Sequence, residues 1–173
     1  TADGTSQVLT VNIAGTNDGW QAALDMKNNA LVIDYAAGSS PLATVANQIK
    51  SGRGTGAWNG AGITSSAAAA VAANSSNTHK TAVGFAEASA LPGITSFGGI
   101  ATDSTMVLIR YTYYGDANLD GKVNALDFNA VATNFGASGK SWVNGDFDYN
   151  GTIDTGDFTA MSQNFGQSLG AAP

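Results

Sequence analysis

The chain has 173 residues, of which 43% are apolar, 13 are acidic and seven are basic, and its formal net charge is −6. This length suits one domain, or one domain with a small appendage, and the apolar content is sufficient for a hydrophobic core. The chain has no cysteine and therefore no disulfide, its few basic residues are scattered, which argues against a nucleic-acid ligand, and no apolar run of 18 residues is present to span a membrane.

The first 114 residues are predicted to be β-rich with two helices. Apolar residues alternate along Val8–Ala14, which predicts a strand. Segments Ala22–Lys27 and Leu31–Tyr35 flank Asn28 and Asn29, a pair that tolerates left-handed backbone conformations, so a tight hairpin is expected there. Later strands are predicted at Thr81–Ala86, Ile94–Ile100 and Met106–Tyr113.

Two helices are expected between these strands. Ser40 and Pro41 are typical of a helix start, and the apolar residues that follow them recur at helical spacing up to Gly52. The glycine-rich run Gly52–Gly62 is predicted to be a flexible connector that carries Trp58, and an alanine-rich helix is predicted at Ser65–Ala73. The expected fold class is α+β, with a sandwich-like β domain followed by a small helical module.

Little in this first region indicates catalysis. His79 is the only histidine and lies in a polar stretch, so it is predicted to be a solvated loop residue. Glu87 and Asp103 are the acids considered as a glycosidase pair, but a surface role for Glu87 is the favoured interpretation. Three tryptophans, Trp20, Trp58 and Trp142, are predicted mainly as core residues, with a sugar-binding platform as the alternative. The chain is therefore expected not to be an enzyme.

A 22-residue stretch occurs twice, at Gly115–Gly136 and Gly145–Gly166, and each copy opens with a 12-residue loop rich in oxygen-bearing side chains. Calcium takes six to eight oxygen ligands, and alternating positions of a tightly turning loop direct such oxygens inward. A glycine at position 6 of each loop permits the sharp turn, and position 7 is expected to contribute its backbone carbonyl. The predicted ligands of two Ca²⁺ ions are Asp116, Asn118, Asp120, Lys122, Asn124 and Asp127 in the first loop, and Asp146, Asp148, Asn150, Thr152, Asp154 and Asp157 in the second.

Each loop runs into a predicted helix with the same apolar spacing. Both helices are expected to stop at Asn-Phe-Gly, where Gly136 and Gly166 suit a left-handed C-terminal cap. The two apolar stripes are predicted to pack on each other about a pseudo-twofold axis. Their members are Phe128, Val131, Ala132 and Phe135 in the first repeat, and Phe158, Met161 and Phe165 in the second.

The two repeats resemble the duplicated calcium repeats of type I dockerins. In that family the last ligand is aspartate, as at Asp127 and Asp157, and the helix before the loop is missing. The resemblance covers about the last third of the chain, and it implies a dockerin-like calcium-binding module at 115–173 after a β-rich domain at 1–114. The longer segment Asn29–Gly166 is similar to the C-terminal regions of exported planctomycete-type bacterial proteins, a likeness that implies no particular activity.

Two features depart from the dockerin pattern. The loop positions that contact the cohesin partner in that family hold Ala125 and Leu126 in the first repeat, and Thr155 and Gly156 in the second. No flexible linker precedes the module, because the strand expected at Met106–Tyr113 ends almost directly at Gly115. Calcium binding is therefore expected to carry over whereas cohesin binding is not, and the module is expected to form one rigid body with the first domain.

Seven of the 13 carboxylates lie in the two loops, so two bound calcium ions would bring the net charge from −6 to about −2. Extracellular calcium modules have dissociation constants of ~10⁻⁴–10⁻³ M, far above cytosolic calcium, and this favours an exported, cell-surface location. The function expected first is a non-catalytic structural protein that associates with copies of itself, or with another cell-surface protein, into a filament. Strand addition by the segment Val8–Ala14 is the expected contact. The alternatives are a tethering module for a cohesin-like receptor and a carbohydrate-binding module for a polysaccharide.

Overall fold

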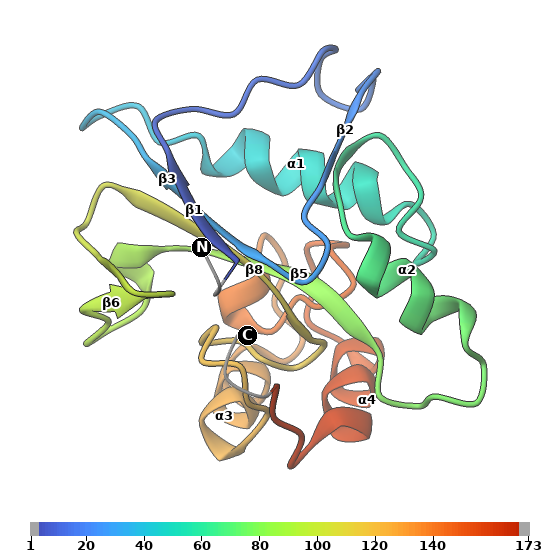
Figure 1. The fold of residues 1–173 in the computed structure, drawn as a ribbon. Coiled ribbons are helices and arrows are strands. Elements are labelled where there is room, and N and C mark those ends of the chain that lie inside the picture. The colour runs from blue at the N-terminus through green and yellow to red at the C-terminus, as the bar shows by residue number, and fades with distance from the viewer. Residues whose placement is uncertain (1–3, 170–173) are drawn as a thin grey trace.

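A four-stranded mixed sheet forms the centre of the computed structural model, which describes residues 4–169 (Figure 1). Its strand order is β1-β3-β8-β5, in which β1 pairs parallel with β3, and β8 pairs antiparallel with both β3 and β5. The bounds are Thr5–Val8 for β1, Ala30–Asp34 for β3, Thr81–Glu87 for β5 and Met106–Tyr113 for β8. The chain therefore belongs to the α+β class, as predicted.

Two small sheets and four α-helices complete the described part of the chain. One small sheet pairs β2 (Ala23–Asp25) with β4 (Gly62–Thr64) in parallel, and the other is the hairpin of β6 (Ser96–Phe97) and β7 (Ile100–Ala101). The helices are α1 (Leu42–Arg53), α2 (Ser66–Ala73), α3 (Ala125–Asn134) and α4 (Thr155–Asn164), with short 3-10 helices η1 (Ala88–Ala90) and η2 (Trp142–Asn144). None of the helices within residues 4–169 is long and apolar enough to cross a membrane.

The helices lie on both sides of the central sheet, with α1 and α2 on one side and α3 and α4 on the other (Figure 1). Successive residues of a strand point to opposite faces, so the face of β8 that carries Arg110 and Thr112 is turned toward the two loops. Arg110 donates a hydrogen bond to the Leu119 carbonyl, and Thr112 donates one to Asp116. The strand that leads into the first loop thus also holds it against the sheet.

Several predicted elements are confirmed. The strand Met106–Tyr113 has the predicted bounds, and β5 extends one residue beyond the predicted Thr81–Ala86. Helix α1 begins after Pro41, and Ser65 caps α2 by accepting a hydrogen bond from the Ala68 amide. Local signals were sufficient at these places because each helix start carries a residue that the first turn requires.

The strand expected at Val8–Ala14 is wrong. Strand β1 ends at Val8, which pairs with Ile33, one residue before the end of β3, so β3 offers almost no further backbone with which residues 9–14 could extend the ladder. The hairpin expected at Asn28 and Asn29 is also wrong. The chain does turn there, with the Asn29 amide donating to the Met26 carbonyl, but β2 then pairs with β4 whereas β3 pairs with β1 and β8.

Two glycine-containing segments also differ from expectation. The strand predicted at Ile94–Ile100 is the β6–β7 hairpin instead, because Gly98 and Gly99 take positive φ angles of 54° and 81° that reverse the chain. The run Gly52–Gly62 is closely packed and is not a loose connector, since a Cβ on Gly60 would lie 2.0 Å from the Ser51 carbonyl oxygen. The sandwich expected of the first region is not confirmed, because helices and loops cover the faces of the sheet.

One cluster of buried apolar side chains extends through both predicted regions. It includes Ile49 and Ile63 from the first region and Leu119, Trp142 and Ile153 from the second, all at most 1% exposed. Gly84 of β5 marks the tightest contact between the regions, because a Cβ there would lie 2.6 Å from Leu119 Cδ2 and 2.7 Å from the Trp142 ring. The two loops therefore share the core of the sheet.

Candidate metal centres

The aspartate at position 1 of each loop closes the turn in the same way. Asp116 accepts hydrogen bonds from the amides of Asp120 and Gly121 at 3.0 and 2.9 Å, and Asp146 accepts from those of Asn150 and Gly151 at the same two distances. Both carboxylates are buried. The identical pattern indicates that the sequence repeat is also a structural repeat.

The aspartate at position 12 of each loop binds back to the start of that loop. Asp127 accepts from the amides of Ala117, Asn118 and Asn124, and Asp157 accepts from those of Phe147, Asp148 and Asp154, over distances of 2.7 to 3.2 Å. Each is also the third residue of the helix that follows and completes a capping box with the residue at position 9. The aspartate at position 12 therefore fixes both the loop and the first turn of its helix.

The two repeats are interlocked. The segment after α3 pairs with the second loop, through a 2.8 Å bond from the Gly136 amide to the Ile153 carbonyl. The segment after α4 pairs with the first loop, through an equal bond from the Gly166 amide to the Val123 carbonyl. Because each loop is closed by the other repeat, neither loop has its full set of contacts when the other is unfolded.

Buried side chains extend this interlocking. Gly115, at the entry to the first loop, lies against Met161 of α4, and Gly145, at the entry to the second, lies against Val131 of α3. A Cβ at either glycine would come within 2.9 Å of the facing residue. The predicted pseudo-twofold packing is therefore present, although it uses Val131 and Met161 and leaves the phenylalanines of the stripes exposed.

Position 7 of each loop is suited to supply a backbone oxygen. Lys122 and Thr152 each form an isolated antiparallel bridge, with Ser168 and Ser138 respectively, and the bridging hydrogen bonds are made by neighbouring residues. In such a pair the N–H and C=O of the bridge residue point away from its partner. The Lys122 amide donates to the Asp120 side chain and the Thr152 amide to the Asn150 side chain, so this side of the backbone faces residues of its own loop.

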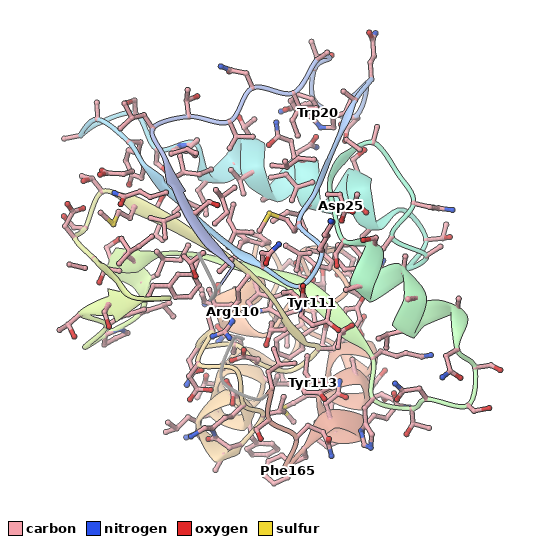
Figure 2. The ribbon with its side chains drawn as sticks, viewed as in Figure 1. Trp20, Asp25, Arg110, Tyr111, Tyr113 and Phe165 are labelled. Atoms are coloured by element: carbon pink, nitrogen blue, oxygen red, sulfur yellow. The ribbon has the colours of Figure 1, made fainter. Side chains whose placement is uncertain are left out.

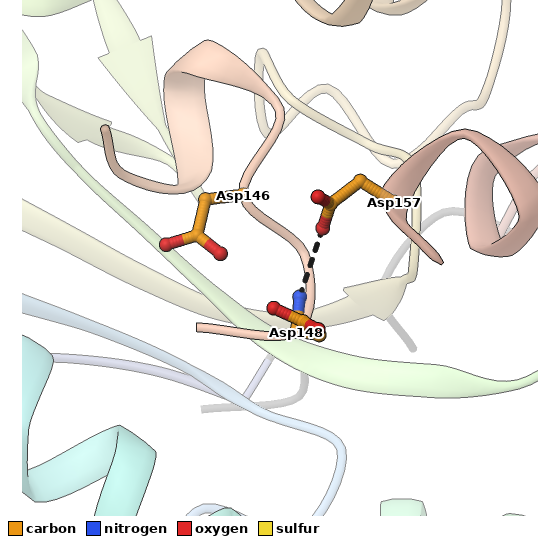
Figure 3. Close-up of side chains that lie close together, drawn as sticks. All are labelled: Asp146, Asp148 and Asp157. Carbon is orange, nitrogen blue, oxygen red and sulfur yellow. Dashed lines mark hydrogen bonds between the residues drawn. The ribbon is translucent and has the colours of Figure 1, made fainter. Parts of the chain in front are cut away.

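Three carboxylates of the second loop lie close enough to share one cation. Asp146, Asp148 and Asp157 each offer an oxygen within 4.8 Å of the others, and Figure 3 shows them converging, with the Asp148 amide bound to Asp157. The first loop has Asn118 in the place of Asp148, so its equivalent group contains one amide oxygen. Oxygen-only sets of carboxylates, amides and backbone carbonyls are those that calcium prefers, and the residues fit this ion.

The predicted ligands at positions 3, 5 and 9 are less buried than those at positions 1 and 12. Asn118 and Asp120 in the first loop, and Asp148 and Asn150 in the second, each accept a backbone amide two residues ahead. Asn124 and Asp154 act as helix N-caps through the amides of Leu126 and Gly156. All twelve predicted residues therefore belong to the two turns, and the innermost are the aspartates at positions 1 and 12.

Burial changes the protonation of these aspartates. Desolvation raises the pKa of Asp116 to about 7 and that of Asp146 to about 6, against an ordinary value of 3.8. Desolvation also raises the pKa of Asp127 and of Asp157, although each accepts three backbone amides. Carboxylates that are held together and kept from water in this way favour a positive ion in the loop.

Contacts that the sequence did not reveal fasten the module to the sheet. His79, expected to be solvated, is half-buried, with its Nδ1 atom 2.8 Å from the Gln163 carbonyl oxygen at the end of α4. Asn164 donates to the carbonyls of Lys80 and Tyr114, and Tyr149 donates to the Val83 carbonyl on the edge strand β5. These partners lie 50 to 84 residues apart in the chain, so no local pattern indicates them.

The residues considered for other chemistry are engaged elsewhere. Glu87 accepts hydrogen bonds from Tyr35 and Ser40, and Asp103 accepts from Thr105. Trp58 and Trp142 are buried, at 2% and 0% exposure, so neither presents a ring face to a sugar. Trp20 is half-buried and donates from its indole nitrogen to Asn47.

No protein-family model, curated protein or solved structure matches this chain. The interpretation of the two loops therefore depends on their own geometry.

Proposed function

We propose that the chain is a non-catalytic, exported structural protein whose dockerin-like double loop binds two calcium ions. The observation that carries this proposal is the repeated pattern of hydrogen bonds, in which the same two loop positions gather buried carboxylates around an oxygen-lined turn. Bound calcium would supply the positive charge that these carboxylates lack. Because the loops share the core of the sheet, the ions stabilise the whole fold.

Calorimetric titration tests the calcium proposal directly. Two binding events are expected for the chain stripped of metal, with dissociation constants of ~10⁻⁴–10⁻³ M. Millimolar calcium then adds only ~0.4–1.4 kcal/mol per site by mass action, which appears as a rise in melting temperature. The proposal fails if calcium produces no heat and the melting temperature is the same in calcium and in EGTA.

We further propose that this protein assembles with copies of itself by strand addition at β1. Strand β1 is one end of the four-stranded sheet, whereas the other end, β5, is covered at Val83 by Tyr149. A groove beside β1 is lined by Val8, Val11, Leu24 and Leu31, which suits the side chains of an added strand. Within β1, the part proposed to pair with the neighbouring subunit is Ser6–Val8.

A lysine on the exposed side of β1 tests the strand-addition contact. Gln7→Lys keeps a partner for Asp34, to which Gln7 donates at 3.0 Å, and places a charge of the kind that blocks edge pairing. Gln21→Lys is the matched control, because Gln21 is exposed and lies outside the strands. Filaments seen by electron microscopy in millimolar calcium should disappear for the Gln7 variant alone. Monomers of the unchanged chain at high concentration would contradict assembly.

The tethering and carbohydrate-binding alternatives make different predictions. A tethering module would bind a cohesin-like receptor in a panel of such domains, and a carbohydrate-binding module would sediment with an insoluble glycan. The sugar alternative has less support, because two of the three tryptophans are buried. Both assays use the calcium-loaded chain.

A further inference from the structure

Four phenylalanines of the loop module are exposed. Phe128 and Phe158 are 40% and 44% exposed, and Phe135 and Phe165 are 55% and 52% exposed. Large apolar side chains that gather on a surface mark an interaction site more reliably than scattered ones do. We call these four residues the phenylalanine face.

The four residues form a row that follows the pseudo-twofold symmetry. The rings of Phe128 and Phe158 meet edge to face at its centre, with centroids 6.4 Å apart. The bond from Gly136 to Ile153 places Phe135 beside the segment entering α4, and the bond from Gly166 to Val123 places Phe165 beside the segment entering α3. Phe165 lies at the end of the molecule far from Trp20 (Figure 2).

No exposed charge interrupts the two helices that carry this row. The only ionisable residues of α3 and α4 are Asp127 and Asp157, and both are completely buried. The exposed residues that flank the phenylalanines at helical spacing are small and uncharged, namely Ala125, Ala132, Thr155 and Ser162. The two helices therefore add apolar area and no exposed charge of their own to the face, although Lys122, just before α3, is exposed.

The exposed area is substantial for so small a module. Together the four side chains expose almost as much area as two fully exposed phenylalanines, which is roughly 400 Å² at about 200 Å² per residue. A stable interface covers about 800 Å² on each partner, so the row supplies about half of one side, with the flanking small residues adding to it.

We propose that the phenylalanine face docks against the same face of a second copy of this chain. A twofold contact brings the same patch together from both copies, and α3 and α4 bring no exposed like charges to such a contact that would repel one another. Any partner recognised by charge would find its complement on the acidic loops and not on this face. A second copy supplies a matching row of rings that removes both apolar surfaces from water.

This inference rests on the proposed calcium binding, because the dimer is expected to form only when the loops hold their ions. Phe128 and Phe158 each directly follow the loop's last aspartate, whose carboxylate fixes the first turn of the helix. A loop that loses its ion and opens would move these rings out of the row. The dimer is therefore expected in calcium and is expected to weaken in a chelator.

Sedimentation equilibrium of the full chain, with and without calcium, provides the test. The double variant Phe128→Ser, Phe158→Ser is made in the Gln7→Lys background, so that no dimer can form through β1, and it is expected to weaken the dimer on the order of a hundredfold, since central aromatic residues dominate such interfaces. Leu126→Ser is the matched control: Leu126 is 65% exposed on the same helix but points about 200° away from Phe128, so the dimer should persist. Gln7→Lys separates this contact from the one at β1, because that variant should still form dimers.

The outcomes distinguish the two proposals. Calcium heat in all variants, with dimers lost only in the double phenylalanine variant, supports the inference. Calcium heat in an unchanged chain that stays monomeric overturns the inference and leaves calcium binding intact, as would a dimer that survives the double substitution. If adding calcium to the unchanged chain produces no heat, the calcium proposal is overturned. If the dimer is equally stable in the chelator, the dependence of the dimer on calcium is overturned.

Discussion

At the scale of single residues, the buried aspartates decide how the loops respond to pH. An aspartate whose pKa is higher in the folded than in the unfolded chain binds its proton more tightly when folded. Asp116 and Asp146, with folded pKa values of about 7 and about 6, therefore favour folding when they are protonated and oppose it when they are ionised. Calcium bound as proposed would reverse this effect, because a cation binds only the ionised form.

The first prediction follows from that reversal. Without calcium, stability should fall as pH rises from about 4 to about 7, the window between the unfolded and folded pKa values of Asp116. In millimolar calcium the fall should disappear, so the calcium-induced rise in melting temperature grows through the same window. Melting curves in metal-stripped and calcium buffers measure this. An Asp116→Asn variant should lose the part of the slope between about pH 6 and 7 and keep a smaller slope below it, where Asp146 still titrates. An unchanged slope would contradict the assignment.

A second prediction concerns the aspartate at position 12. Asp157 accepts two backbone amides on one oxygen and the Asp154 amide on the other, so Asp157→Asn, with a single acceptor oxygen, leaves at least one of these donors unpaired. This should cost ~1–3 kcal/mol in urea unfolding even without metal, and it should abolish one of the two calcium heats. Asp154→Asn is the control, because its capping oxygen is retained and the cost without metal should be small. Equal losses in both variants would contradict this view of Asp157.

At the scale of elements, the sequence predicted helix starts and turns, which depend on nearby residues, better than it predicted which strands pair. The helix starts at Pro41 and Ser65, the strand β8 and all the turns of the two loops follow from residues within a few positions of one another. The failures at Val8–Ala14 and at Asn28 are failures to identify the neighbouring strand, which lies far along the chain. Alternation and turn residues say where a strand or turn can form, but tertiary pairing decides which strands meet.

The candidate site shows the same division. The ligand positions were predictable because the loop brings them together within 12 residues, whereas His79 and Asn164 are joined to their partners by long-range contacts. The exposure of the phenylalanines was not predictable either. Their helical spacing is that of a buried stripe, and only the interlocked packing shows that Val131 and Met161 take the inner positions.

The contact between β5 and the module gives a third prediction. Gly84→Ala places a Cβ within 2.7 Å of both Leu119 and Trp142, so it should cost about 1–3 kcal/mol through overpacking. Gly19→Ala is the control, since its nearest neighbour would be 3.6 Å away and its backbone is compatible with alanine. Urea unfolding with both variants measures the difference. If Gly84→Ala left the free energy of unfolding unchanged, the module would not be in close contact with β5.

At the scale of the whole molecule, the two proposed contacts use different surfaces, the edge of the central sheet at β1 and the outer side of the loop module. The segment after β1 crosses the end of the fold above α1, and the loop module occupies the other end (Figure 1). One twofold contact alone closes into a dimer, but two different twofold contacts on one subunit propagate into a chain. The proposed filament thus needs both the β1 edge and the phenylalanine face, and either substitution should stop growth at the dimer.

The shared core leads to the last prediction, that the sheet and the loop module unfold together. Trp142 is completely buried, donates to the Asp116 carbonyl and lies against Gly84, so unfolding either region exposes the other. Calorimetry should show one transition that calcium moves as a whole, and a fragment of residues 1–114 should not fold, because the face of β5 and β8 beneath the module would be bare. Two transitions, with only one responding to calcium, would indicate a detachable module of the kind that a flexible linker carries. The direct passage from β8 into the first loop argues for the single transition, since Thr112 and Asp116 are four residues apart and hydrogen-bonded to each other.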